Sequence, residues 1–294
     1  MTTDWSFPAG EVPPPRLHLT NENDLAHRYW EEHEYNGARI TRMADVVRRP
    51  VEWLWPGRIP RGAITLLDGD PEVGKSTITL DLAARLSTGA TPPDSRWERR
   101  SPEATLLVGA EDALDTTVRP RLEAAGAALQ HISCLEAVYT DSEPNGRPLR
   151  LPTDVPALHR AVLNTDASLV VIDPIMSFID ADVNSSIDQD VRRVLWPLGR
   201  MADETGAAVV IVRHLTKGSV GGPALYRGGG SMGIIGAARS ALMAQRDPED
   251  PTGTTCVLTH TKCNLARRSQ PLDYKVVADP LPGMGRIIWE DETA

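Results

Sequence analysis

The segment GDPEVGKST, residues 69–77, has the residue types and the spacing of a loop that holds phosphate groups. It matches the pattern G-x-x-x-x-G-K-[ST] after an apolar run, 63–67, and at the start of a helical pattern. In such a loop, backbone N–H groups point at the β-phosphate, Lys75 reaches the β and γ oxygens, and the Ser76 hydroxyl joins the Mg²⁺ shell. The motif therefore predicts binding of a nucleoside triphosphate with Mg²⁺ through Gly69, Asp70, Pro71, Glu72, Val73, Gly74, Lys75, Ser76 and Thr77.

One acid stands in this expected anion site. Glu72 lies at the crown of the loop. Because Gly74, Lys75 and the backbone around them are expected to hold the phosphates, the Glu72 side chain can point away from the nucleotide. We expect it to face the γ-phosphate side or an adjacent subunit and to take part in assembly.

Carboxylates follow two apolar segments that have the pattern of buried strands. Asp173 ends the run in VVIDP, where a carboxylate would lie opposite the phosphate loop and hold Mg²⁺ directly or through water. Glu111, in LLVGAED, would lie at the same sheet edge and is suited to orient and deprotonate a water in line with the γ-phosphate. Glu111 is therefore the expected catalytic base, and Asp112 is expected to cap the following helix.

A histidine and a glycine-rich segment follow a later strand pattern. His214, in IVRHLTKG, is placed to sense the γ-phosphate, and a histidine with a purely structural role at a strand end is the alternative. The segment 217–233 contains Lys217, Tyr226 and Arg227, whose types bind single-stranded nucleic acid by phosphate contact and base stacking. These three residues are the candidates for contact with single-stranded DNA.

Composition limits the partners and the location. With 294 residues and 41% hydrophobic residues, the chain can bury the core of one main domain. The net charge of −9 argues against a protein that coats nucleic acid over its whole surface, so any such contact must be local. The sequence lacks both an apolar run of about 18 residues and a signal-like start, so we expect a soluble cytoplasmic protein without membrane contact.

Strand and helix patterns alternate along most of the chain. Short apolar segments separated by amphipathic ones predict an α/β fold, in which helices cover both faces of a parallel sheet. From Arg239 onward the patterns predict strands alone, as an antiparallel extension of the sheet. The expected strands are 64–68, 104–112, 131–137, 168–174 and 207–215, and the expected helices are 76–88, 116–127, 155–164 and 189–205, the last kinked by Pro197.

Other segments lack such periods. Residues 1–38 mix prolines, acids and aromatic residues, and are expected to form an extended or partly disordered arm before a domain that covers 39–294. Residues 91–103 and 140–154 are polar and proline-rich, and are expected to be loops.

Six segments together resemble the RecA-like ATPases of the AAA_25, or RepA-type, group over roughly residues 51–277. This group is similar to hexameric replicative helicases of the DnaB kind, to the plasmid RepA helicase and, more distantly, to KaiC and RecA. The resemblance implies a P-loop core with a mostly parallel sheet and antiparallel C-terminal strands. The segments are WLWPGRIPRGAITLLDGDPEVGKST, GAED, VVIDP, RHLTKG, GAARSAL and THTKCNLA.

The resemblance also implies roles for individual residues. Lys75 and Ser76 match the phosphate-loop positions, and Glu111 matches the catalytic glutamate. Asp173 matches the metal-side aspartate, and His214 matches the polar sensor.

Rings of this kind place each nucleotide between two subunits, so the resemblance implies a hexameric homo-oligomer with cations that act in trans. Arg239 in GAARSAL looks like the arginine finger, and Lys262 in THTKCNLA looks like the trans lysine. The sequence departs from the DnaB-type Lys-x-Arg pattern at Asn264, which makes Arg227 a rival of Arg239 for the finger.

Three functions remain open from the sequence. The leading hypothesis is a Mg²⁺-dependent ATPase that, as a ring, moves on single-stranded DNA in replication or mobile-element biology. The segment 177–190, which corresponds to the first channel loop of such rings, carries aspartates and no Lys or Arg. That charge favours the alternative, an ATP-driven switch that acts on a replication or regulatory protein. A small-molecule P-loop kinase is the third, and the C-terminal strands suit a subunit interface better than its arginine-bearing lid.

Overall fold

The computed structural model describes residues 41–94, 100–181, 183, 187–214, 232–278 and 285–290. The chain divides into two compact units, residues 1–49 and 50–294. In the first unit, residues 41–49 are exposed and include one 3-10 turn, Met43–Asp45. The expected arm, 1–38, and the candidates Lys217, Tyr226 and Arg227 lie outside the described residues, so what the sequence predicts for them stays a prediction.

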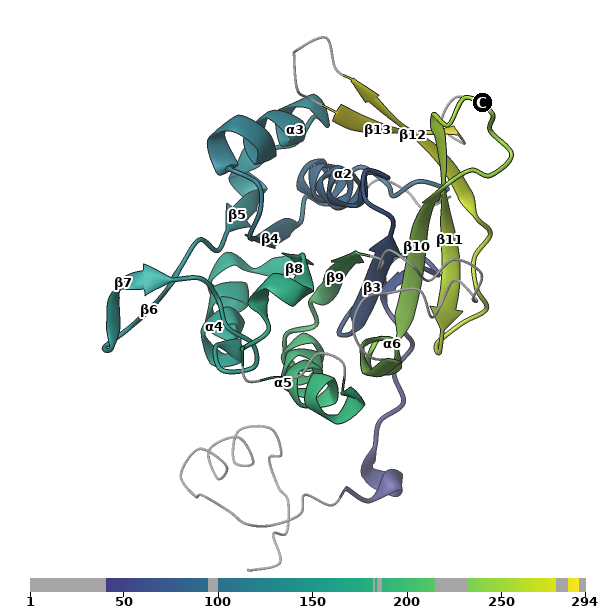
Figure 1. Cartoon of the computed structure of the whole chain (residues 1–294). Coiled ribbons are helices and arrows are strands. Elements are labelled where there is room, and N and C mark those ends of the chain that lie inside the picture. The colour runs from purple at the N-terminus through teal and green to yellow at the C-terminus, as the bar shows by residue number, and fades with distance from the viewer. Residues whose placement is uncertain are drawn as a thin grey trace, which may run out of the picture. The chain divides into compact units, whose positions relative to one another are not determined.

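A nine-stranded sheet forms the centre of the second unit (Figure 1). The six strands from β10 to β5 run parallel, and β11 to β13 add antiparallel pairs at one side. This arrangement confirms the predicted α/β class. In sheet order the strands are β13 (Gly285–Trp289), β12 (Leu272–Ala278), β11 (Thr255–Cys263), β10 (Ser240–Arg246), β3 (Ile64–Gly69), β9 (Ala208–His214), β8 (Ala167–Asp173), β4 (Ala104–Gly109) and β5 (Ile132–Cys134).

Short elements and helices surround this sheet. The hairpin of β1 (Trp53–Trp55) and β2 (Ile59–Pro60) precedes β3. Among the described residues, no helix combines the length and the apolar character needed to cross a membrane. The helices are α2 (Lys75–Thr88), α3 (Arg119–Ala124), α4 (Val155–Thr165), α5 (Asp188–Thr205) and α6 (Met232–Ala237), and the helical turns are η2 (Leu114–Val118), η3 (Leu129–His131) and η4 (Ile175–Phe178).

Both faces of the sheet are buried because its central strands are apolar on both sides. Leu66 packs in a core with residues of α4, α5 and α6, whereas the next residue, Leu67, packs in a second core with residues of α2 and α3. Figure 1 shows these two groups of helices on opposite faces. Helix α5 continues through Pro197. The alternation of strand and helix read from the sequence is therefore present, and it puts the carboxyl ends of the parallel strands at one edge.

The direction of β10 differs from the prediction. This strand pairs parallel with β3, with Ser240 opposite Thr65 and Ala244 opposite Gly69, and the antiparallel part begins only at β11. The prediction of an antiparallel extension is wrong for this strand because an apolar pattern indicates burial and carries no information on direction. As a result, the end of β10 lies against the start of the phosphate loop.

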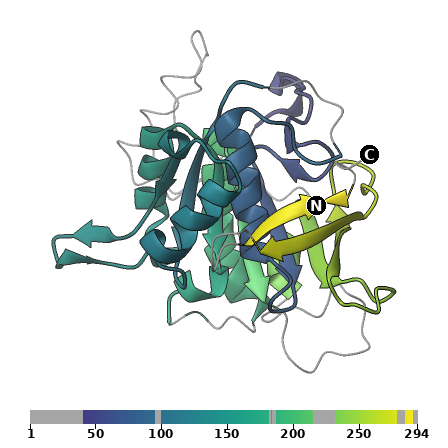
Figure 2. The ribbon, with the colours of Figure 1, turned by 90° about the horizontal axis from the view of Figure 1, so that it is seen from above.

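The segment 140–154, expected to be a loop, contains most of a hairpin. Strand β6 (Val138–Thr140) pairs antiparallel with β7 (Glu143–Arg147), and the ribbon projects from the rest of the unit in both views (Figures 1 and 2). The expectation failed because both strands are short and β7 is polar, without a periodic apolar face. Tyr139 lies beside Gly146, where an added Cβ would come within 2.8 Å of the Tyr139 Cε1 atom.

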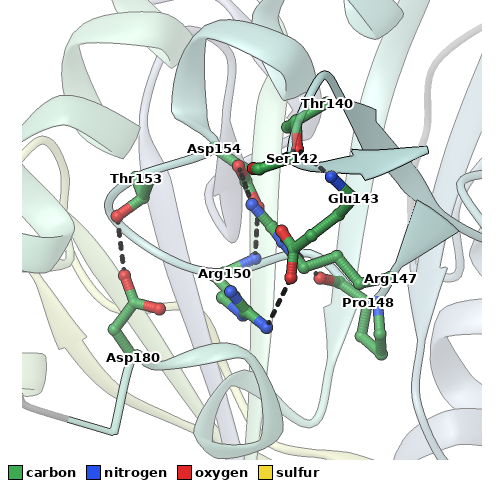
Figure 3. Close-up of polar contacts among 9 residues, drawn as sticks. All are labelled: Thr140, Ser142, Glu143, Arg147, Pro148, Arg150, Thr153, Asp154 and Asp180. Carbon is green, nitrogen blue, oxygen red and sulfur yellow. Dashed lines mark hydrogen bonds and ion pairs between the residues drawn. The ribbon is translucent and has the colours of Figure 1, made fainter. Parts of the chain in front are cut away.

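Ionic contacts tie the base of this hairpin to the start of α4 (Figure 3). Arg147 donates through Nη2 to Asp154 Oδ1 at 3.0 Å and through Nε to Glu143. The backbone N–H of Arg150 donates to Asp154 Oδ2 at 2.7 Å. Burial by itself would raise the pKa of Asp154, but the hydrogen bonds from Arg147 and Arg150 outweigh burial and hold that pKa below its ordinary value.

Asp154→Asn is expected to lower the free energy of unfolding by about 1–3 kcal/mol at neutral pH, because charge-assisted hydrogen bonds to a buried carboxylate are lost. Since the folded-state pKa is depressed, the wild-type contribution is present above the unfolded value of 3.8 and is lost as the pH falls through the folded-state value. Urea unfolding at pH 7 and pH 3 measures both effects, and the wild type should lose more stability than the variant. Equal losses in the two proteins would contradict this role of Asp154.

Candidate nucleotide-binding site

The phosphate loop joins the end of β3 to the start of α2 and lies against β10 and β12. A Cβ on Gly69 would lie 2.3 Å from the carbonyl oxygen of Ala244, so β10 leaves room only for glycine. Gly74 immediately precedes α2 with φ of 80°, and a Cβ there would lie 2.6 Å from Val276 Cγ2. Both motif glycines are therefore required by neighbouring strands, and Gly74 also by its left-handed backbone.

Lys75 is the first residue of α2 and is 4% exposed. Its Nζ donates hydrogen bonds to the carbonyl oxygens of Gly69, at 2.9 Å, and Asp70, at 2.7 Å, so the ammonium lies beside the start of the loop. Burial lowers the pKa of Lys75, because it penalises the charged form. The carboxylates that oppose this shift are those of Asp173, Asp70, Asp68 and Glu111.

The end of β8 brings Asp173 next to the start of α2. Burial raises the pKa of Asp173 above its ordinary value, and the charge of Glu111 adds to the rise. A hydrogen bond from the Ser76 hydroxyl and the positive charges of His214 and Lys75 act in the opposite direction. The structure thus brings together at one sheet edge five of the residues that the sequence predicts for the triphosphate and its metal: Lys75, Ser76, Glu111, Asp173 and His214.

Glu111 lies just past β4, which ends at Gly109 rather than at Asp112 as expected. Its side chain is exposed and lines a cavity of about 300 Å³ that also contains Asp173 and Ser76. This cavity is large enough for several waters, since one water occupies about 30 Å³ in the liquid. Glu111 therefore borders a space where water has access to the phosphate loop. The apolar part of the lining consists mainly of Leu80, Leu107, Leu114, Val118, Leu135 and Val171.

The predicted helix cap at Asp112 is wrong. The residue that precedes the π-helical turn η2 is Ala113, one position later. Asp112 Oδ2 instead accepts a hydrogen bond from Arg121 Nη1 at 2.8 Å and so forms an ion pair with α3. The chain enters a π-helical turn before α3, so the Asp112 carboxylate lies outside the first turn of the helix. It therefore pairs with the Arg121 guanidinium and does not cap the free backbone N–H groups at the helix start.

A pocket of about 240 Å³ opens over the phosphate loop, and two of its residues had no sequence signal. These are Arg121 from α3 and Val276 from β12. The hydroxyl of Tyr274 donates to the carbonyl oxygen of Val73 at 2.6 Å, which ties β12 to the loop. Contacts between segments about 200 residues apart have no local pattern, so only the fold reveals them. The full lining is Glu72, Gly74, Lys75, Ser76, Thr77, Arg121, His214 and Val276.

The family of the chain follows from a comparison that covers this site. Residues 35–220 match the family model AAA_25, described as an AAA domain. The chain belongs to the AAA_25 family. The matched segment contains the phosphate loop, Glu111, Asp173 and His214, which are the residues that meet at the carboxyl edge of the sheet.

Several curated relatives of this AAA_25 protein carry the name DNA repair protein RadA. The RadA of Halalkalibacterium halodurans is 31% identical over 173 residues, which are 58% of this chain and 32% of that protein. The RadA of Bacillus subtilis is 29% identical over 173 residues, which are 58% of this chain and 31% of that protein. The similarity therefore spans about a third of the length of these relatives and indicates a distant relation to RadA.

A solved structure supports the fold assignment. The crystal structure of a KaiC-like protein from Pyrococcus horikoshii superposes with a TM-score of 0.54 and 17% identity, over 81% of this chain and 100% of that one. At this identity the likeness concerns the fold. The family match and the distant relation to RadA make the AAA_25 chain a P-loop ATPase domain, and the solved structure shows that its fold is KaiC-like.

Two of the three cations predicted to act in trans, Arg239 and Lys262, lie at the other end of β10. Arg239 is exposed, and its backbone N–H donates to the carbonyl oxygen of Ile64 at 2.9 Å, at the amino end of β3. Lys262 donates through Nζ to the carbonyl oxygens of Ile235 and, at 2.7 Å, Ala238. Burial lowers the pKa of Lys262, and the charge of Arg239 lowers it further. Neither residue joins the phosphate loop of its own chain, so their roles stay predictions.

Glu72→Gly tests the expectation that Glu72 does not bind the phosphates. Glu72 is exposed at the pocket rim, and its φ of 65° is left-handed, a conformation that glycine adopts without strain. The variant should keep the affinity for an ATP analogue within about threefold, because its backbone N–H groups and Lys75 are retained. Calorimetric titration of the isolated subunit measures this, and a loss of affinity beyond tenfold would show that Glu72 contributes directly.

Proposed function

We propose that this AAA_25 protein hydrolyses ATP with Mg²⁺ at the carboxyl edge of its sheet. The observation that supports this most directly is the convergence of Lys75, Glu111 and the hydrogen-bonded pair of Ser76 and Asp173 around the phosphate loop. A hydroxyl and a carboxylate are the oxygen ligands that Mg²⁺ prefers, so Ser76 and Asp173 suit the metal. Mg²⁺ bound there supplies charge neutralisation at the phosphate oxygens.

Each residue has a separate task in this proposal. The backbone N–H groups at the start of α2 and the Lys75 ammonium bind the β and γ oxygens. The Glu111 carboxylate accepts a proton from the water that attacks the γ-phosphorus, while the bond from that phosphorus to the bridging oxygen of ADP breaks. His214 lines the same pocket as Lys75, and we assign it the detection of the γ-phosphate.

We further propose that the protein forms a hexameric ring that moves on single-stranded DNA in replication or mobile-element biology. Two observations support this: the relatives are named DNA repair protein RadA, and the glycine-rich segment holds Lys217, Tyr226 and Arg227. ATPase activity measured at low salt with and without single-stranded DNA tests the proposal. Several-fold stimulation is expected, and the absence of both stimulation and DNA binding would exclude a DNA translocase while leaving ATP hydrolysis standing.

A switch that acts on a replication or regulatory protein is the second candidate. The net charge of −9 and the aspartates of the segment 177–190 favour it, because acidic surfaces repel phosphate. A pull-down in ATP and in ADP, each with and without nuclease, separates the two candidates. Capture of the same protein only in ATP, and unchanged by nuclease, would favour the switch.

Arg239→Ala is expected to lower ATPase activity at least tenfold if this arginine completes a neighbour's site. An arginine beside the phosphate oxygens stabilises the negative charge of the transition state and so contributes strongly to the rate. Its exposed position, away from its own phosphate loop, is consistent with such a role. Mixing Arg239→Ala subunits with Lys75→Ala subunits should restore part of the activity, because some interfaces then combine an intact loop with an intact arginine. Full activity of Arg239→Ala alone would remove it as the finger.

A further inference from the structure

A buried ion pair joins the last-but-one residues of β3 and β9, directly before the phosphate loop. Asp68 precedes Gly69, Arg213 precedes His214, and the two are register partners in the parallel ladder. Arg213 donates through Nε to Asp68 Oδ1 at 2.7 Å and through Nη2 to Oδ2 at 2.6 Å. The side chains are 1% and 4% exposed for Arg213 and Asp68. Both oxygens of the carboxylate are therefore held by one guanidinium, away from water.

A third charge lies close to this pair. The Lys75 ammonium is bonded to the carbonyl oxygens of the two residues that follow Asp68 along the chain, Gly69 and Asp70. The Asp68 carboxylate and the Lys75 ammonium each shift the other's pKa toward the charged form. Burial raises the pKa of Asp68, and the hydrogen bond and the charge of Arg213 oppose that rise. Arg213 and Lys75 thus both act on one buried carboxylate, Arg213 through direct hydrogen bonds and Lys75 through its charge.

We propose that Arg213 is a positioning residue for nucleotide binding: by occupying both oxygens of Asp68, it keeps that carboxylate from capturing the Lys75 ammonium, which stays available to the triphosphate. This inference rests on the proposed ATP site and adds to it a residue that does not contact the nucleotide. This role would explain why position 213, in a strand whose preceding residues are all apolar and buried, holds an arginine.

An unpaired charge is costly at this depth. A buried ion pair often contributes little to stability compared with apolar residues of the same size, but removal of one partner leaves a costly unpaired charge. Without Arg213, the Asp68 carboxylate keeps Lys75 as a neighbouring cation. An ion pair between Asp68 and Lys75 would compete with the γ-phosphate for the Lys75 ammonium. Removal of both charges would relieve this competition. The single substitution is therefore expected to weaken ATP binding, and the double substitution to restore it.

The test measures the dissociation constant of a slowly hydrolysed ATP analogue with Mg²⁺ by calorimetry, for the full chain and four variants. Arg213→Met is expected to bind at least tenfold more weakly than the wild type. The double variant Asp68→Asn with Arg213→Met should return to within threefold, and Arg213→Lys should also stay within threefold because it keeps the counter-charge. Arg147→Met is the matched control, because it removes an arginine from a carboxylate pair at the projecting hairpin, and it should stay within twofold.

Several results would overturn the inference. Wild-type affinity of folded Arg213→Met would do so, as would a double variant that binds as weakly as the single one, which is the outcome for a purely structural pair. Urea unfolding monitors folding of each variant. If Arg213→Met does not fold, the double variant and Arg213→Lys decide, and a double variant that also fails to fold or to bind overturns the inference. A wild type that binds no nucleotide refutes the proposed function itself, which is a distinct result.

Discussion

Lys75→Ala is expected to weaken ATP binding at least a hundredfold and to abolish hydrolysis. Lys75 lies at the start of α2, and its ammonium is placed beside Gly69 and Asp70, where the phosphate loop begins. Loss of charge-assisted hydrogen bonds to two phosphate oxygens costs about 3 kcal/mol or more, and each 1.4 kcal/mol is about a tenfold change in affinity. Calorimetric titration and a phosphate-release assay measure both effects.

No other described cation of the pocket is placed to replace it. Arg121 lines the same pocket, but its guanidinium is bonded to Asp112 and extends from α3. Lys275→Ala is a matched control, because that lysine is exposed on β12 and paired with Glu290, and its loss should leave ATP affinity within twofold. ATP binding by Lys75→Ala at wild-type affinity would mean that the phosphates are not held by this loop.

Glu111→Gln is expected to keep ATP affinity within about threefold and to slow hydrolysis by about 10²–10⁴-fold, the range of a lost general base. The amide has nearly the same shape as the carboxylate but cannot accept the proton of the attacking water. Glu111 borders the cavity that contains Ser76 and Asp173, so a water there can reach both the carboxylate and the metal ligands. Single-turnover hydrolysis separates the chemical step from binding and product release.

The control for this substitution is Glu123→Gln. Glu123 is exposed on α3 and pairs with Arg119, so its neutralisation should change hydrolysis less than twofold. If Glu111→Gln hydrolyses ATP at the wild-type rate, Glu111 has no part in the proton transfer. Asp112 would then be the next acid to test, although it is already paired with Arg121.

Local patterns predicted the parts of the site that depend on neighbouring residues in the chain. The phosphate loop places its two glycines, lysine and serine within eight residues, so their relation follows from one turn and one helix start. Asp173, Glu111 and His214 could also be predicted together, because carboxyl ends of parallel strands meet at one edge. The polar hairpin of β6 and β7 and the direction of β10 could not, since neither burial pattern nor length encodes pairing direction.

Pairings between distant segments required the tertiary structure. Arg121 and Val276 reach the pocket only because α3 and β12 pack beside the loop, and Asp112 pairs with Arg121 only because a π-helical turn precedes α3. The register of β3 against β9 likewise places Arg213 on Asp68, 145 residues away. No spacing in the chain indicates this pair, although each partner flanks a residue that the sequence had singled out.

The sequence by itself determined that GDPEVGKST has the pattern of a phosphate loop, because that pattern lies within one short segment. It also determined the α/β class, because burial on both faces of a strand is written in its composition. The tertiary structure decided the surroundings of this loop. It determined which strands require glycine at positions 69 and 74, which residue pairs with Asp112, and which cation pairs with Asp68. Those features depend on the free energy of contacts between segments far apart in the chain, which local periodicity does not record.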